Sequence, residues 1–319
     1  MRMNMTKNTM GNAGKRKTRK NGGKDISEIL DGLKDQHSSS EIEERSIERE
    51  RESNQYQPVI VKRTDETFRH ADDVLEMAIH EGQSQLQRPE LSLFMSSVAA
   101  GMIIGCTVLA VGVMASILGN VDGINKIFVA LVYPLGFILC ILSRTELFTE
   151  HTATAVYPLL DGSAKAQSVL KLWAIVIAGN LCGGLLIALM LATADGVIHA
   201  SEGYLILAEH VLDYDYQVLF VSAILAGWLM ATGAWTILST HSTGSQILCI
   251  YIATFVIGVG GLHHSIAGSV ELFVGLFTSE EIKLADIIPA IGVILAGNAV
   301  GGSIFVALLN YGHIRSLNK

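Results

Sequence analysis

His264 is the residue whose type and position in this sequence most strongly suggest chemistry. It follows the glycine-rich stretch 258–263 and lies inside a long apolar run. An ionisable side chain at membrane depth is energetically expensive, so it marks a functional site by default. Because imidazole titrates near neutral pH, His264 could exchange a proton with a weak acid. The alternative is a structural histidine that hydrogen-bonds to freed backbone, and for the neighbouring His263 we favour that structural or an exposed role.

Other kinds of chemistry have little support in the sequence. It contains no nucleophile–base arrangement, phosphate-binding loop or cluster with metal-ligand spacing, so we expect no enzyme, no metal and no cofactor. The four cysteines all lie in apolar runs and form no CxxC pair. This placement favours small apolar packing residues over metal or disulfide roles.

A short repeat divides the apolar part of the chain into two halves. Residues 177–184 (IAGNLCGG) return as residues 295–302 (LAGNAVGG). Internal repeats within apolar runs are typical of transporters and channels. The glycines four residues apart share one helix face and let helices approach closely. We expect Asn180 and Asn298 to hydrogen-bond to neighbouring non-helical backbone rather than to contact a substrate.

The charge distribution predicts where the membrane-spanning part begins. Of the 23 Lys and Arg residues, seven lie beyond residue 90. We predict an all-α membrane protein with a disordered cytoplasmic tail at 1–60, an amphipathic interfacial helix at 61–90 and a six-span transmembrane domain at 91–319. The six spans are expected near residues 91–118, 125–158, 166–194, 216–239, 244–277 and 285–312.

The second and fifth predicted spans are too long and too interrupted to be plain helices. The breaks are expected around residues 143–146 and 258–264. Non-helical backbone at membrane depth must be buried in protein or line a polar cavity. Two broken spans in matching positions of two halves therefore point to a central site. Arg144 and Glu146 lie at the first break, where pairing with each other or anchoring of the loop is favoured over a direct role in conduction.

Loop charges predict the orientation of the spans. The connection at 195–215 carries five acidic residues and no Lys or Arg, so we expect it outside the cell, on the same side as Lys126. The basic N-terminal tail and the C-terminus, with Arg315 and Lys319, are expected in the cytoplasm. The prediction is a multi-pass protein of the inner (plasma) membrane with both termini inside.

Three segments, together with the two Gly-Asn elements, resemble the formate/nitrite transporter family. They are residues 135–140 (LGFILC), 146–149 (ELFT) and 264–267 (HSIA), and the similarity covers roughly residues 66–319. The resemblance implies a protomer with an aquaporin-like inverted repeat of three plus three spans. It also implies a homopentamer in the lipid bilayer with a pore in each protomer, and no nucleic-acid partner.

The resemblance assigns roles to individual residues. His264 is similar to the family's central pore histidine, and Thr149 to the threonine that faces it. The other implied positions surround two constrictions, with Leu147, Phe148, Phe137 and Met230 at the inner one and Tyr133 and Ile257 at the outer one. Asn180, Asn298 and Glu146 are expected to be structural residues near the pore.

The sequence also departs from the family pattern around the pore. Val211 stands where formate channels of the family have a lysine, and His263 where an acidic residue is common. Gly227 and Gly268 replace asparagines. These changes predict a divergent member with a different or broader substrate.

The resulting hypothesis is transport of small monovalent anions, such as formate, nitrite or hydrosulfide, or of their weak acids. His264 would relay the proton. Two alternatives stay open, namely a channel for small neutral solutes and a membrane-anchored scaffold that works through its N-terminal tail.

Overall fold

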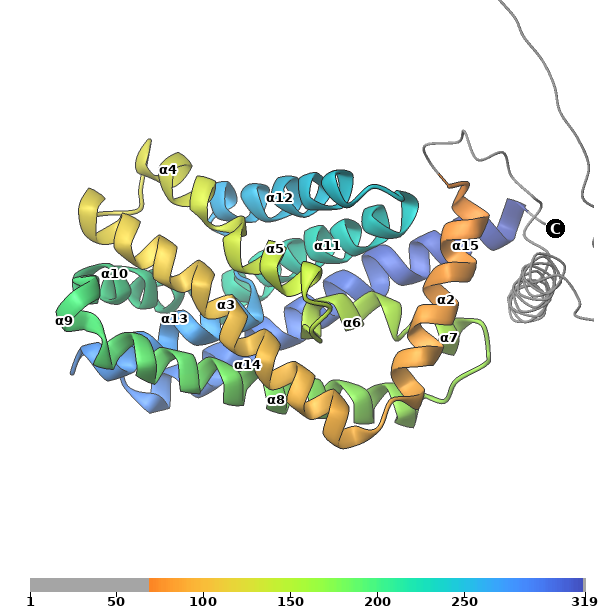
Figure 1. Ribbon diagram of the computed structural model, residues 1–319, viewed down its shortest axis with the longest axis horizontal. Helices are drawn as coiled ribbons and strands as arrows, with labels where there is room; N and C mark the ends of the chain where they lie inside the picture. The colour runs from red at the N-terminus through yellow and green to blue at the C-terminus, as the bar shows by residue number, and fades with distance from the viewer. Residues whose placement is uncertain (1–68, 318–319) are drawn as a thin grey trace, which may run out of the picture. The chain divides into compact units, whose positions relative to one another are not determined.

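The computed structural model describes residues 69–317, and within this range all regular elements are helices, with no β-strand (Figure 1). The predicted all-α class is therefore confirmed. The predicted tail at 1–60 and Lys319 lie outside the described residues, as does the first part of the predicted interfacial helix.

The first half of the described chain contains three long helical segments and several short helices. They are α2 (Ala71–Gln87), α3 (Glu90–Leu118), α4 (Asn125–Val132), α5 (Pro134–Leu142), α6 (Phe148–Thr154), α7 (Tyr157–Leu160), α8 (Ala166–Thr193) and α9 (Asp195–Ile198).

The second half begins with a helix that connects it to the first. Its helices are α10 (Ser201–Leu212), α11 (Tyr216–Ser239), α12 (Thr243–Gly260), α13 (Ser265–Thr278), α14 (Leu284–Gly302), the π-helix η1 (Ser303–Leu308) and α15 (Leu309–Leu317).

Six stretches of the described chain are long and apolar enough to cross a membrane, as the sequence predicted. Each begins at the predicted residue or one residue before it. They are Glu90–Leu118, Asn125–Leu142, Ala166–Thr193, Tyr216–Ser239, Thr243–Gly260 and Leu284–Arg315. An 18-residue stretch such as Thr243–Gly260 is about 27 Å long, close to the thickness of the bilayer's hydrocarbon core. Many large apolar side chains on these helices are exposed, as expected for surfaces that face lipid.

The connection at 195–215 is not a plain loop, because it contains α9 and α10. The buried residues of α10 recur at helical spacing, at Gly203, Tyr204, Leu207, Ala208 and Val211. This stripe packs α10 against α3 and α13. The sequence predicted an acidic loop for this connection, whereas the helical spacing of its buried residues corresponds to α10.

Two helix pairs approach closely through the glycines of the repeat. On α8, a Cβ atom at Gly183 would lie 2.0 Å from the carbonyl oxygen of Val98 on α3. On α14, a Cβ atom at Gly301 would lie 2.2 Å from the carbonyl oxygen of Ile224 on α11. Any larger residue would push these helices apart, so the two pairs depend on glycine at these positions.

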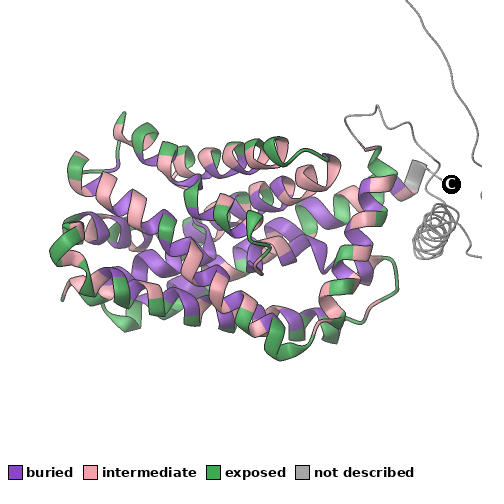
Figure 2. Cartoon of the chain, viewed as in Figure 1, coloured by how far each residue is buried: buried purple, intermediate pink, exposed green. Residues whose placement is uncertain are grey.

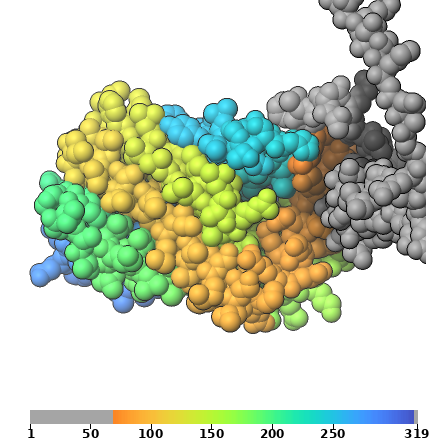
Figure 3. All heavy atoms as spheres, in the orientation of Figure 1, coloured from red at the N-terminus to blue at the C-terminus, as the bar shows by residue number. Residues whose placement is uncertain are grey.

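The short helices α6 and α13 form the interior of the bundle. Residues 265–272 of α13 are buried without interruption, and most of α6 is buried as well (Figure 2). On the face drawn in Figure 3, side chains of α3, α5 and α12 fill the spaces that the ribbons leave open. Helix α2 lies at one end of the bundle with α7 and α15, whereas α4, α9 and α10 lie at the other end (Figure 1).

Candidate functional site

The starts of α6 and α13 meet in the interior of the bundle. Thr149 is the second residue of α6, and His264 directly precedes α13. The Thr149 hydroxyl oxygen lies 2.9 Å from Nε2 of His264, although 115 positions separate the two residues in the chain. Both side chains are buried. The structure therefore brings together the two polar residues of the predicted pore.

The hydrogen bonds of His264 define which ring nitrogen carries the hydrogen. His264 is the N-cap of α13, and its Nδ1 accepts a hydrogen bond of 3.3 Å from the backbone N–H of Ala267. A nitrogen that accepts a hydrogen bond has no hydrogen of its own in the neutral ring. Nε2 therefore carries the hydrogen and donates it to the Thr149 hydroxyl. This arrangement suits a neutral imidazole.

Asn180 holds the backbone at the start of α6. Its Oδ1 accepts a hydrogen bond of 2.9 Å from the N–H of Phe148. Its Nδ2 donates to the carbonyl oxygens of Ser97 and Glu146, both at 2.8 Å. One buried amide thus satisfies the N–H and the carbonyl at the start of α6 that no helix pairs, and it also bonds to the carbonyl oxygen of Ser97 within α3.

Asn298 makes the same set of contacts at the start of α13. Its Oδ1 accepts a hydrogen bond of 2.7 Å from the N–H of Ser265. Its Nδ2 donates to the carbonyl oxygens of Ala223, at 2.7 Å, and His263, at 3.1 Å. The two asparagines of the repeat therefore contact equivalent backbone atoms in the two halves.

Aromatic rings surround one side of His264. The ring of Phe137 meets the imidazole edge to face, with centroids 4.8 Å apart and planes at 82°. Tyr133 follows at 5.3 Å from Phe137. Such rings form an apolar, close-packed wall beside the polar pair.

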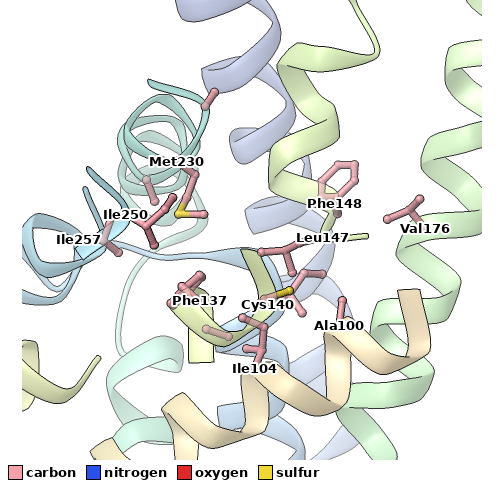
Figure 4. Close-up of a cluster of buried hydrophobic side chains, with 14 of the residues drawn as sticks. Ala100, Ile104, Phe137, Cys140, Leu147, Phe148, Val176, Met230, Ile250 and Ile257 are labelled. Carbon is pink, nitrogen blue, oxygen red and sulfur yellow. The ribbon is translucent and has the colours of Figure 1, made fainter. Parts of the chain in front are cut away.

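The residues of the predicted inner constriction are tightly packed. Phe137, Leu147, Phe148 and Met230 are each at most 1% exposed. Figure 4 shows Leu147 near Cys140, Met230 beside Ile250 and Ile257, and Phe148 turned toward Val176. Phe148 also meets the ring of Trp173 edge to face at 5.9 Å. The side chains come from α5, α6, α11 and the loop before α6 and pack into one core cluster.

A cavity of about 590 Å³, which includes space open to solvent, leads to His264 from the α10 end of the bundle. Of the predicted pore residues, Tyr133, Ile257 and His264 line it. Thr149 and the four residues of the predicted inner constriction do not line it. The cavity therefore ends at the histidine, with packed apolar side chains beyond.

The sequence did not identify most of the polar side chains of this cavity. The cavity is lined by Lys126 of α4, His210 of α10, His263 of the segment before α13 and Glu271 of α13. Glu271 follows His264 by seven residues, or two helical turns, so its place on the same face was readable from the sequence. His210 gave no such signal, because it belongs to the connection whose helix was not predicted.

Gly261 allows Lys126 and His210 to approach the backbone between α12 and α13. Its φ is +60°, and a Cβ atom there would lie 3.2 Å from His210 Nε2 and 3.3 Å from Lys126 Nζ. Burial, and then the nearby charge of Lys126, lower the pKa of His210. His210 is therefore neutral more often than an exposed histidine at the same pH.

Glu146 is tied to α2 and α6, and not to Arg144. It forms an ion pair with Arg88, which follows α2, and its Oε2 lies 2.5 Å from Nε2 of His151 of α6. His151 Nδ1 in turn lies 2.9 Å from the side-chain oxygen of Gln85. Arg144 is exposed with φ at 52°. Of the predicted possibilities, the contacts of Glu146 favour anchoring of the loop.

Comparison with known proteins identifies the family. The formate/nitrite transporter family model matches residues 72–312. The inner membrane protein YfdC of Escherichia coli (strain K12) is 31% identical over 249 residues, which cover 75% of this chain and 79% of that protein. The formate channel FocA of Haemophilus influenzae is 26% identical over 248 residues, which cover 70% of this chain and 86% of that protein.

A solved structure has the same fold. A pentameric formate channel with formate bound aligns with a TM-score of 0.61 and 21% sequence identity, over 71% of this chain and 98% of that chain. The fold, the six membrane-spanning stretches and the match over residues 72–312 agree. This chain therefore belongs to the formate/nitrite transporter family and is a transporter-type membrane protein, not an enzyme.

Proposed function

We propose that the protein conducts small monovalent anions, or the weak acids they form, through a pore in each protomer, and that His264 relays a proton to the anion. The observation that carries this proposal is the position of His264. It lines the inner end of the cavity and also contacts Thr149 in the interior. The family description and the formate channels among the similar proteins support the substrate class.

The hydrogen bonds of His264 constrain how a relay can run. In the neutral ring Nε2–H donates to Thr149, and Nδ1 accepts from Ala267. An external proton must therefore enter at Nδ1, which displaces the bond from Ala267. The resulting imidazolium attracts the anion and can pass its Nε2 proton to an anion oxygen. The products are a neutral acid and a neutral ring with its hydrogen on Nδ1, so one proton and one anion are consumed.

The apolar core beyond His264 is the reason that a proton transfer would help the solute to pass. Phe137, Leu147 and Met230 are buried there and offer no hydrogen bond to a passing solute. Moving a charge through such surroundings costs far more than moving a neutral polar molecule. Protonation at His264 would therefore lower the barrier for a weak acid much more than for the anion of a strong acid.

The matched contacts of Asn180 and Asn298 support an inverted relation between the two halves. The similarity to a pentameric formate channel supports a homopentamer, and the similarity to an inner membrane protein supports an inner-membrane location. We infer both for this chain, with its termini on the cytoplasmic side. The division into a tail at 1–60, an interfacial helix and a transport domain stays a prediction.

Uptake by purified protein in liposomes tests the proposed function. The panel should contain formate, nitrite, hydrosulfide, chloride and the neutral solutes urea and glycerol, each followed by stopped flow at pH 5.5 and 7.5. We expect uptake of the weak-acid anions, faster at the lower pH, and little uptake of chloride. Empty liposomes measure direct permeation of the acids. Uptake of urea or glycerol without weak-acid uptake would instead establish the neutral-solute channel.

A further inference from the structure

We propose that His263, beside the pore histidine, forms a separate binding subsite in the cavity for a small monovalent oxyanion such as formate. This inference rests on the proposed transport function, because it describes where the anion waits before it reaches His264. The sequence favoured a structural or exposed role for this residue. The structure shows that it is 6% exposed and lines the cavity.

The contacts of His263 identify the ring nitrogen that is available to a ligand. The Ser222 hydroxyl oxygen accepts a hydrogen bond of 3.2 Å from the backbone N–H of His263 and lies 2.8 Å from its Nδ1. Since the hydroxyl already accepts from the backbone, its own hydrogen is free to bond to Nδ1. His263 then carries its hydrogen on Nε2. The serine thus fixes the tautomer.

Nε2 of His263 is buried and makes no hydrogen bond of normal geometry among the described residues, and beyond Ser222 the only polar contact of the ring is a weak one with the backbone of His210. An N–H donor buried without an acceptor is unfavourable, so such a group calls for an explanation. Asn298 accounts for the backbone carbonyl of this residue and Ser222 for its backbone N–H and Nδ1. The remaining donor is the one group of His263 that these contacts leave for a ligand.

The surroundings of His263 favour an anion as that ligand. The ring of His210 stacks on it at 5.9 Å with planes 17° apart, and Lys126 lines the same cavity. The ring of Tyr214 meets it edge to face at 5.3 Å. Glu271 also lines the cavity and opposes negative charge. The site therefore suits a small anion that carries one charge and accepts a hydrogen bond.

Two substitutions separate the donor from the contact with Ser222. His263→Asn places an amide oxygen near the position of Nδ1 and can keep the Ser222 bond, but it has no atom at Nε2. His263→Gln places an amide N–H near Nε2 and gives up the Ser222 bond. His199→Asn is the matched control, because His199 is exposed and lies outside the cavity.

The measurement is line broadening of [13C]formate in NMR spectra of the full-length protein in detergent micelles, together with the half-saturation concentration for formate uptake into liposomes. We expect His263→Asn to weaken binding and raise the half-saturation concentration roughly tenfold, the effect of losing one charge-assisted hydrogen bond. His263→Gln and the control should stay close to the wild type.

The reverse pattern, with Gln impaired and Asn intact, would show that His263 only holds Ser222 and would overturn the subsite. Equal values for all four proteins would overturn it too. The two proposals can fail separately. Binding that depends on His263 without any uptake would contradict transport and leave the subsite standing, whereas uptake that is indifferent to His263 would contradict the subsite alone.

Discussion

His264 combines a structural contact and a chemical one in a single ring. Its Nδ1 caps α13 through Ala267, and its Nε2 contacts Thr149. The two roles compete, because a proton that enters at Nδ1 removes the acceptor on which the cap depends. Substitutions that keep one role and remove the other can therefore separate structure from transport.

Replacing His264 by Asn or Phe gives opposite structural effects. Asparagine is a good N-cap and can still accept from Ala267, whereas phenylalanine cannot, and the loss of a cap costs about 1 kcal/mol. We expect the Asn variant to fold normally with an uptake rate that no longer depends on pH. The Phe variant should lose most uptake at low pH and have a slightly lower Tm.

Formate uptake between pH 5 and 8, with thermal unfolding of the same preparations, checks this prediction. The wild type should take up formate faster as the external pH falls. A histidine with a purely structural role would leave the Asn variant, which keeps the cap, with the pH profile of the wild type. If both fold and keep the wild-type pH profile, the relay is wrong.

Thr149→Val removes one hydroxyl from the site with little change of shape. It leaves the Nε2–H of His264 without its acceptor. An unmade buried hydrogen bond costs ~1–3 kcal/mol, so we expect formate uptake to fall roughly tenfold with assembly unchanged. Uptake is measured in liposomes and assembly by size-exclusion chromatography.

Thr193→Val is the matched control for this variant. Its hydroxyl is exposed and bonds to the carbonyl oxygen of Leu189 within α8. It should leave uptake unchanged. Equal uptake by wild type and Thr149→Val would remove Thr149 from the path.

At the scale of elements, two asparagines hold the starts of the two interior helices. Asn180→Ala would leave the N–H of Phe148 and the carbonyl oxygen of Glu146 without this partner, and Asn298→Ala would do the same to the N–H of Ser265 and the carbonyl oxygen of His263. Each buried unsatisfied group costs ~1–3 kcal/mol. We expect both variants to show a markedly lower Tm and poor assembly in detergent.

Asn120→Ala is the comparison for the two amides. Asn120 is exposed, and its side chain bonds to Asp122 and Asn125 in the turn before α4. It should change Tm little. A loss of stability at one asparagine alone would argue against equivalent roles in the two halves.

The apolar spans were predictable because length and hydrophobicity are local properties. Residues 166–194 were expected as a span, and α8 covers Ala166–Thr193. Helix α10 was not predicted because its stripe of five buried residues lies among acidic ones. The contacts of Glu146 could not be predicted either. Arg88 lies 58 positions away from it, and no local sequence feature favours Arg88 over Arg144 as the partner.

The candidate site also has one part that the sequence predicts and one part that it does not. His264 stands out in the sequence because a titratable residue in an apolar run is costly and rare. The cavity beside it is made by α4, α10 and the segment between α12 and α13, which the chain brings together from distant positions. A pattern along one helix does not show which distant segments come together. The positions of Lys126 and His210 in the cavity are therefore known from the structure and not from the sequence.

At the scale of the whole molecule, each protomer holds a complete site. Thr149, His264, both asparagines and the cavity all belong to one chain. Assembly through outward helix faces would therefore give independent pores. Mixed oligomers test this, because they combine active subunits with subunits whose site is disabled.

We expect formate uptake to fall in proportion to the fraction of His264→Phe subunits in oligomers assembled from both proteins. Different affinity tags on the two subunits allow purification of mixed oligomers and measurement of their ratio by mass spectrometry. Oligomers mixed from wild type and His199→Asn control for the effect of mixing, and their uptake should not change. If each pore lay at a shared axis, one disabled subunit would reduce uptake far more than its share. Complete loss at one disabled subunit per oligomer would contradict a pore in each protomer.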